Sequence, residues 1–261
     1  MACMAVLSLT AQPGPQKPLE RQHESSQIFG LPSLIPHPRD VELLGPFLSV
    51  PLLAGVQVHA HDDPSGPVRQ LGHVLQVDLN AELAAASKDY LNATKSSLLT
   101  AERAPLKVIL ETVAPEALTG RSDAHGRIWG PEAYELLVNH TSHAVVIRAS
   151  YYAGLVHGCR TLRQLLSPSR YRSDNIRSRT SSPSIGLAPT PTMSLPAIRI
   201  TDAPVSTYRG IMVDNVRNQH DFAFHMDMLE RVGASKLNVY QLHASDDQGY
   251  SLPSKVRHTH P

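Results

Sequence analysis

The sequence predicts an α/β fold whose last part is a βαβ unit, in which a helix joins two strands. A short apolar strand at 211–213 is followed by an amphipathic helix at 221–236 and an apolar stretch at 237–242. Because the helix forms a crossover within one sheet, the two strands are expected to run parallel. Upstream, apolar residues alternate along 133–150 and take helical spacing along 151–166, which is typical of a hairpin followed by a helix.

The N-terminal part of the chain predicts an extended region followed by strands. Residues 1–30 are polar and rich in proline and glutamine, so we expect a disordered or targeting segment. Three prolines in 31–44 exclude a helix there and predict extended chain. The apolar stretch 47–60 predicts one or two strands.

The middle of the chain predicts a helix, a strand and a hairpin. Apolar residues at helical spacing predict a helix at 66–89, and LKVILET at 106–112 predicts a short strand. Within the hairpin, residues 139–143 are expected to form the turn. Residues 168–196 are rich in serine, arginine and proline and therefore predict a flexible linker.

The helix expected at 151–166 has one apolar face. Residues expected to point into the core are Leu155, Cys159, Leu162, Leu165 and Leu166. Gly154 and Gly158 lack side chains, so this helix can lie close against a sheet.

Composition excludes several classes of function. The net charge of +1 provides no field for binding nucleic acid or an anionic membrane. No apolar run reaches the roughly 18 residues that a membrane-spanning helix needs. There are two cysteines, Cys3 and Cys159, so we expect no disulfide framework and interpret Cys159 as a buried free thiol.

The expected localisation rests on two kinds of signal. The N-terminal stretch MACMAVLSLTAQPGP has no basic residue before its apolar part, so it is a poor secretory signal. Two glycosylation sequons, at Asn92 and Asn139, favour a secretory route. We therefore expect a secretory, lysosomal or extracellular protein.

Polar side chains follow both strands of the predicted βαβ unit. Asp214 and Arg217 follow the first strand, and His243, Asp246 and Asp247 follow the second. Ligands of parallel α/β folds bind at the carboxyl ends of the strands. An arginine fork suits sugar hydroxyls or carboxylates, whereas paired carboxylates can bind hydroxyls, orient a histidine or ligate a metal. A solvated loop with an ordinary salt bridge is the alternative that spacing leaves open.

The same region resembles a known family. The segments YRGIMVDNVRNQH (208–220) and KLNVYQLHASDDQGY (236–250) are similar to the start of the catalytic barrel in β-N-acetylhexosaminidases of the chitobiase and lysosomal hexosaminidase type. The matching residues are Arg209, Gly210, Asp214, Arg217, Asn218, Lys236, Asn238, His243, Asp246, Asp247 and Gln248. Upstream, 33–43 resembles the family's opening strand, and 132–166 resembles the end of its N-terminal domain.

The resemblance implies an architecture. An α+β N-terminal domain is expected at 31–167, followed by the linker at 168–196. The start of a catalytic (β/α)8 TIM barrel is expected at 197–261, with two of its eight strands. On this interpretation the barrel is incomplete.

The resemblance also implies roles for individual residues. Arg217 matches the arginine that hydrogen-bonds the 3- and 4-hydroxyls of the terminal N-acetylhexosamine. Asp246 matches a carboxylate linked through a histidine to the catalytic acid, a glutamate that it holds in place. Asp214, Asp247 and His243 match supporting positions, where packing and substrate contact are equally open.

The implied reaction is substrate-assisted hydrolysis with retention of configuration. The acetamido oxygen of the substrate attacks the anomeric carbon, a glutamate protonates the leaving oxygen, and a neighbouring aspartate orients the acetamido group. No metal or organic cofactor is implied. The expected partner is a glycan ending in N-acetylhexosamine or a chito-oligosaccharide, and the full-length family suggests a homodimer.

Departures from the family pattern also lead to expectations. The family's Asp-Glu pair lies beyond residue 261, so we expect an incomplete or inactive product. Gln241 stands where the family usually has a histidine. After Tyr250 the resemblance ends, which suggests a truncated gene model, alternative splicing or a frameshift.

Two other interpretations compete with the hydrolase. One is a non-catalytic carbohydrate-binding or interaction module built on the N-terminal domain. The other is a metal protein, since the chain has 14 histidines and His59 and His61 alternate along a predicted strand. No group of residues has four-ligand zinc spacing, so solvated histidines are the expected state.

Overall fold

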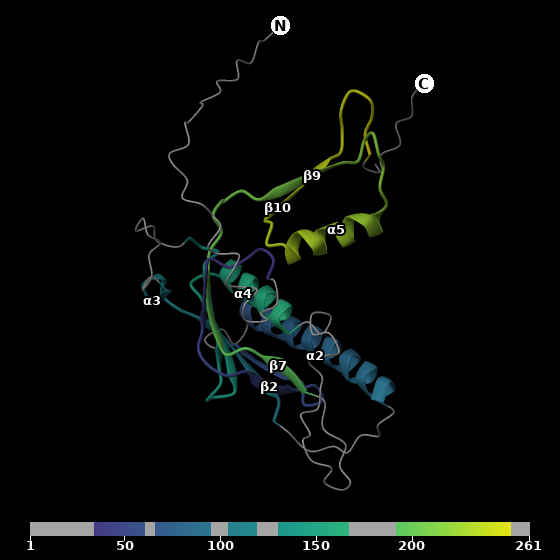
Figure 1. The fold of residues 1–261 in the computed structure, drawn as a ribbon. Coiled ribbons are helices and arrows are strands. Elements are labelled where there is room, and N and C mark those ends of the chain that lie inside the picture. Colours follow the sequence, from purple (N-terminus) through teal and green to yellow (C-terminus); the bar gives the residue numbers. More distant parts are fainter. Residues whose placement is uncertain (1–33, 61–65, 95–103, 119–129, 167–191, 252–261) are drawn as a thin grey trace, which may run out of the picture. The chain divides into compact units, whose positions relative to one another are not determined.

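The computed structural model describes the greater part of the chain (Figure 1). The described residues are 34–60, 66–94, 104–118, 130–166 and 192–251. The predicted disordered or targeting segment 1–30 lies outside them, as do residues 168–191 of the predicted linker.

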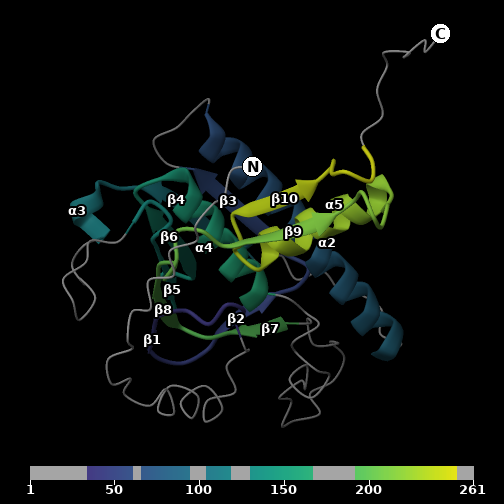
Figure 2. The ribbon, with the colours of Figure 1, turned by 90° about the horizontal axis from the view of Figure 1, so that it is seen from above.

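A six-stranded mixed sheet is the largest sheet of the described residues and is called the N-terminal sheet below; its strand order is β1-β8-β5-β6-β4-β3 (Figure 2). Its strands are β1 (Asp40–Leu43), β3 (Val56–Ala60), β4 (Leu106–Thr112), β5 (Tyr134–Asn139), β6 (Ala144–Ala149) and β8 (Ile198–Asp202). Strands β1, β8, β5 and β6 pair antiparallel, whereas β6, β4 and β3 pair parallel. The predicted strand at 106–112 and the hairpin at 133–150 are therefore confirmed.

Side-chain alternation explains why the hairpin forms half-buried strands. Along β5 the buried residues Tyr134, Leu136 and Val138 alternate with partly exposed neighbours. Asn139 closes the turn, because its Oδ1 accepts hydrogen bonds from the backbone N–H groups of Thr141 (2.8 Å) and Ser142 (3.2 Å). A side-chain acceptor at this place satisfies turn amides that the strand ladder leaves unpaired.

Two helices pack on this sheet. Helix α2 (Pro67–Thr94) contacts β3, and helix α4 (Tyr152–Leu165) contacts β5 and β6. All five residues expected in the core along 151–166 are buried. A short helix, α3 (Pro115–Leu118), lies between β4 and β5 in the sequence. Along the described ranges, no helix is long and apolar enough to cross a membrane.

The glycines of α4 allow the close approach that the sequence predicted. A Cβ atom added at Gly158 would overlap Cγ2 of Ile147 and crowd the ring of Tyr134. A Cβ atom at Gly154 would overlap the carbonyl oxygen of Ala133. Any larger residue at either position would therefore push the helix away from β5 and β6.

The end of the predicted linker forms a strand. Thr192–Leu195 is strand β7, which pairs antiparallel with β2 (Leu48–Pro51). Strand β8, which the predicted boundary at residue 197 assigned to the barrel, pairs instead with β1 and β5 in the N-terminal sheet. Two apolar side chains of β8, Ile198 and Ile200, are almost fully buried in this sheet.

The predicted βαβ unit is present. Strand β9 (Gly210–Asp214), helix α5 (Phe222–Ala234) and strand β10 (Val239–His243) follow one another, and β9 pairs parallel with β10. Asp221 begins the helix, because its side chain accepts a 2.8 Å hydrogen bond from the backbone N–H of Phe224. The α/β class predicted from the sequence is thus confirmed.

One prediction for α5 is wrong in part. The amphipathic helix predicted at 221–236 places Met226, Leu229 and Val232 on its inward face, but only Val232 is buried, while Met226 and Leu229 are each 44% exposed. Two strands lie about 5 Å apart, whereas a helix with its side chains is about 10 Å wide. A two-stranded sheet therefore covers only part of the apolar face of its helix.

Candidate active site at the strand ends

The carboxyl ends of β9 and β10 meet at one edge of their sheet. Asp214 and His243 are the last partners in the parallel register. The pairing continues for one more residue, because the backbone N–H of Asn215 donates a 3.0 Å hydrogen bond to the carbonyl of His243. Both polar clusters that the sequence singled out therefore begin at the same edge.

Asp214 organises the turn that carries Arg217. Its Oδ1 accepts hydrogen bonds from the backbone N–H groups of Val216 and Arg217, both at 3.1 Å. Its Oδ2 accepts a 2.6 Å hydrogen bond from Nε of Arg217. These donors, led by the backbone N–H of Arg217, lower the pKa of Asp214. The carboxylate is thus ionised and holds the arginine in place.

Asp246 plays a similar part in the second loop. Its Oδ1 accepts hydrogen bonds from the backbone N–H groups of Gln248 (2.8 Å) and Gly249 (3.3 Å). Its Oδ2 lies 3.4 Å from Nε2 of His243 and 3.8 Å from Nε of Arg217. The backbone N–H of Gln248 is the largest cause of a lowered pKa at Asp246. Arg217 therefore faces two ionised carboxylates.

The donors of Arg217 are only partly used. Its side chain is 56% exposed, and only its Nε atom is engaged by carboxylates of the described residues. No carboxylate of the described residues engages the two Nη groups, and such a planar fork of donors suits two neighbouring hydroxyls or another oxygen-rich ligand. Neither adjacent carboxylate can act as a general acid near neutral pH, because each has a lowered pKa.

The fifth predicted site residue stands apart. Asp247 is exposed and, within the described residues, makes no hydrogen bond or ion pair. The structure thus brings together Asp214, Arg217, His243 and Asp246, and leaves Asp247 facing solvent.

Three further residues support the first loop and were missed in the sequence. Oδ1 of Asn215 accepts hydrogen bonds from the backbone N–H of His220 (2.8 Å) and from Nε2 of His225 (3.2 Å). Nδ1 of His225 lies 2.6 Å from the hydroxyl of Tyr240 in β10. His225 thus connects helix α5 with Asn215, which follows β9, and with Tyr240 in β10. The signal available in the sequence was an asparagine shortly after an apolar strand, and the structure shows that this asparagine is buried.

The histidines offer no metal site in the part of the chain that the structure describes. No group of three or more His, Cys, Asp or Glu side chains there is arranged to hold a metal ion. His59 lies in β3, and His61 lies outside the described residues.

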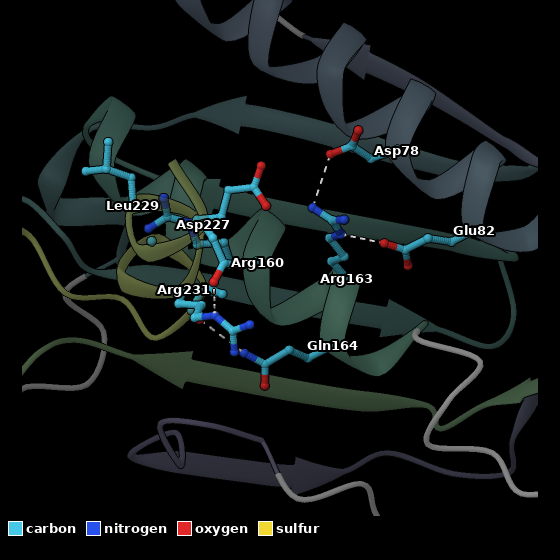
Figure 3. A pocket seen from close by; sticks show the side chains of 11 residues that line it. Asp78, Glu82, Arg160, Arg163, Gln164, Asp227, Leu229 and Arg231 are labelled. Carbon is cyan, nitrogen blue, oxygen red and sulfur yellow. Dashed lines mark hydrogen bonds and ion pairs between the residues drawn. The ribbon is translucent and has the colours of Figure 1, made fainter. Parts of the chain in front are cut away.

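A cavity of about 750 Å³ lies between α2, α4 and α5, away from the strand ends (Figure 3). Most of its charges are already paired. Arg163 binds Asp78 (3.1 Å) and Glu82 (2.6 Å), and Arg231 binds Asp227 at 2.7 Å. None of the predicted site residues lines this cavity.

Two family models match consecutive parts of the chain. "Glycosyl hydrolase family 20, domain 2" matches residues 31–203, which include every strand of the six-stranded sheet. "Glycosyl hydrolase family 20, catalytic domain" matches residues 207–259, which include the βαβ unit and its strand ends.

Individual proteins give a consistent picture. A β-N-acetylhexosaminidase of Cellulomonas fimi is 36% identical over 132 residues, 48% of this chain and 22% of that protein. An N,N'-diacetylchitobiase of Vibrio harveyi is 28% identical over 178 residues, 68% of this chain and 17% of that protein. The chain thus spans about a fifth of the length of these curated relatives.

A solved structure agrees in fold. The N-acetyl-β-hexosaminidase of Streptomyces plicatus superposes with a TM-score of 0.52 at 24% identity, covering 84% of this chain and 35% of that one. The first family match alone, over residues 31–203, covers more than half of this chain. The chain belongs to glycosyl hydrolase family 20.

Proposed function

We propose that this chain provides the N-terminal domain and the hydroxyl-binding part of the active site of a β-N-acetylhexosaminidase. The βαβ unit then corresponds to the first two strands of a (β/α)8 catalytic barrel. The relatives from C. fimi and V. harveyi, a β-N-acetylhexosaminidase and an N,N'-diacetylchitobiase, support this reaction class. The substrate class is a glycan or chito-oligosaccharide that ends in N-acetylhexosamine.

The single observation that carries the proposal is the state of Arg217. Its Nε is fixed by Asp214 at 2.6 Å, and its side chain remains 56% exposed. An arginine held in this way presents two donors in a fixed plane and loses little rotamer freedom when a ligand binds. Vicinal hydroxyls, such as those at positions 3 and 4 of a hexosamine, match that geometry.

Supporting residues have separate tasks in this proposal. Asp214 and Asp246 keep Arg217 oriented and compensate its charge, so the sugar hydroxyls meet a neutralised rather than an isolated cation. His243 donates toward Asp246 and limits the movement of that carboxylate. Asp247, which is exposed, is assigned no contact with the sugar.

Hydrolysis needs a carboxylic acid in addition to the hydroxyl-binding residues around Arg217. In the substrate-assisted reaction the acetamido oxygen attacks the anomeric carbon, while a carboxylic acid protonates the leaving oxygen. Asp214 and Asp246 are unsuited to that protonation, because their pKa values are lowered. We therefore expect the 261-residue chain by itself to bind the sugar without hydrolysing it. No observation favours a stand-alone binding module over this assignment.

The proposal can be tested in a chimera. Residues 31–251 replace the corresponding segment of the C. fimi relative, and release of 4-nitrophenol from 4-nitrophenyl N-acetyl-β-glucosaminide is measured. Hydrolysis is expected, and Arg217→Met should lower kcat/KM roughly tenfold to a hundredfold, because a hydrogen bond to a charged group is lost. Arg148→Met is the matched control, since Arg148 pairs with Glu111 in the N-terminal sheet. A folded chimera with equal kcat/KM for both variants would contradict the proposal.

A further inference from the structure

Lys236 has a backbone conformation that normally belongs to glycine. It follows helix α5 and has φ +57°. The N–H of Lys236 donates to the carbonyl of Gly233, and the N–H of Leu237 donates to that of Val232, both at 3.0 Å. This is the Schellman arrangement, in which glycine is the usual residue at the left-handed position. The backbone does not explain why a lysine rather than a glycine occupies this position, so the contacts of its side chain must.

The Lys236 side chain enters the N-terminal domain. Its Nζ donates 2.9 Å hydrogen bonds to Oδ2 of Asp202 in β8 and to the hydroxyl of Tyr134 in β5. Those two residues are cross-strand partners in the sheet. The side chains of Lys236 and Asp202 are only 6% and 9% exposed, and Tyr134 is 1% exposed. An ammonium group is rarely buried to this degree unless it is paired.

The pocket for this ammonium is fully built from the N-terminal domain. The hydroxyl of Tyr134 also contacts Oγ1 of Thr161 in α4 at 2.7 Å. The second oxygen of Asp202, Oδ1, accepts a 3.2 Å hydrogen bond from the backbone N–H of Arg39. Because each acceptor is held by other partners, the site is preorganised for a cation from outside the sheet.

A second cation makes a parallel connection. Arg209, just before β9, binds Glu132 through Nη2 at 2.6 Å and Nη1 at 3.0 Å. Its Nε donates a 3.0 Å hydrogen bond to the carbonyl of Lys236, so the two connections are themselves linked. Nε2 of His157 in α4 contacts the same Glu132 at 3.0 Å. In both connections the cation comes from the βαβ side and the carboxylate from the N-terminal domain.

We propose that Lys236 and Arg209 anchor the β9–α5–β10 unit to the N-terminal domain, which thereby positions the strand ends that carry Arg217 and Asp246. Two strands and one helix bury little apolar surface, as the exposed Met226 and Leu229 show. The ion pairs of Arg209 and Lys236, at the amino ends of β9 and β10, hold this unit on the N-terminal sheet in place of an apolar interface. The anchoring does not depend on the proposed function; only its consequence for sugar binding does.

The decisive variant is Lys236→Gly in the full chain. Glycine suits the left-handed backbone, so a merely local role of Lys236 predicts an unchanged or higher Tm. Anchoring predicts a fall in Tm of roughly 5–15 °C, since Asp202 is left buried without its cation. Arg231→Met is the matched control, because it removes a cation of α5 that is 70% exposed, and it should leave Tm unchanged. An unchanged or raised Tm in Lys236→Gly would overturn the proposal.

Hydrogen exchange gives a second measurement that separates anchoring from general destabilisation. In Lys236→Gly, amides of β9 and β10 should exchange at least roughly tenfold faster, while those of β4 and β6 keep their protection. The double variant Lys236→Met with Asp202→Asn removes both charges of the buried pair. It is therefore expected to fold even if Lys236→Gly does not, and hydrogen exchange can be measured on it. It should show the same selective increase in exchange. Equal changes in all four strands, or none, would overturn the proposal.

Discussion

Nε of Arg217 donates a 2.6 Å hydrogen bond to Oδ2 of Asp214, which lies three residues earlier in the chain and ends strand β9. The same carboxylate also accepts two backbone N–H groups of the turn between them. A single side chain therefore fixes both the loop and the arginine that it carries.

The Asp214→Asn variant tests this relationship. The amide keeps the size of the side chain but loses its charge, so Arg217 is held less firmly. We expect the Kd for N-acetylglucosamine to rise roughly two- to fivefold, as for other exposed ion pairs. Asp247→Asn makes the same charge change at an exposed residue and should leave Kd unchanged. Equal Kd values in the two variants would argue against a positioning role for Asp214.

Helix α4 provides a test of the close packing on the sheet. Gly158→Ala should lower the free energy of unfolding by about 1–3 kcal/mol, because the new methyl group would overlap Ile147. Gly72→Ala is the control within α2, where the added Cβ would lie 3.3 Å from a methyl of Val58. That variant should lose less stability than Gly158→Ala, because its closest contact is longer and alanine adds helix propensity. Urea unfolding measures both, and a stabilised Gly158→Ala variant would show that α4 does not lie so close to β6.

The burial of His157 and the pairing of Glu132 with Arg209 predict that stability falls in acid. Burial lowers the pKa of His157, and the hydrogen bond from Arg209 is the main cause of the lowered pKa of Glu132. The unfolded chain therefore binds a proton at His157 below pH about 6.5, before the folded chain does. The free energy of unfolding should fall as the pH decreases from that value through the lowered folded pKa. Protonation of Glu132 adds a further loss below its ordinary value of 4.5.

A titration-silent variant isolates the histidine contribution to this pH dependence. His157→Gln keeps an N–H donor for Glu132 but cannot take up a proton. Urea unfolding between pH 5 and 7 should then show a smaller decrease in stability than the original protein. If the two proteins lose stability in parallel, His157 is not responsible for the effect.

Cys159 should be unreactive in the folded protein. It is a buried free cysteine, and burial raises the pKa of its thiol to about 12. Since the thiolate is the reacting species, alkylation by iodoacetamide at pH 8 should be roughly a hundredfold slower than in urea. Peptide mapping by mass spectrometry separates Cys159 from Cys3. Rapid labelling of Cys159 without denaturant would mean that the core around α4 opens readily.

The strands and helices that could be predicted are those with a local apolar pattern. The hairpin at β5 and β6 and the helix α4 have such patterns, and their predicted and observed limits agree closely. Strand β7 has only four residues, TMSL, and its partner β2 lies more than a hundred residues away in the sequence. Strand β8 was assigned to the barrel for the same reason, because pairing with β1 and β5 leaves no local trace.

The candidate site shows the same division. Asp214, Arg217, His243 and Asp246 follow apolar strands directly, so the rule for parallel strand ends could place them together. The contact between His225 and Tyr240 depends on how α5 lies across the strands, which the sequence does not contain. Contacts such as that of Arg209 with Glu132 join residues 77 positions apart and were equally inaccessible.

Sugar binding by Arg217 is the central claim, and NMR titration of the 261-residue chain with N-acetylglucosamine tests it most directly. The side-chain Nε–Hε signal of Arg217 and the backbone amides of Val216 and Gln248 should shift and reach saturation. The shifts should disappear in Arg217→Met and persist in Arg231→Met. No saturable shift in the original protein, or the same shifts in Arg217→Met, would contradict the assignment of the strand ends as the hydroxyl-binding part of the site.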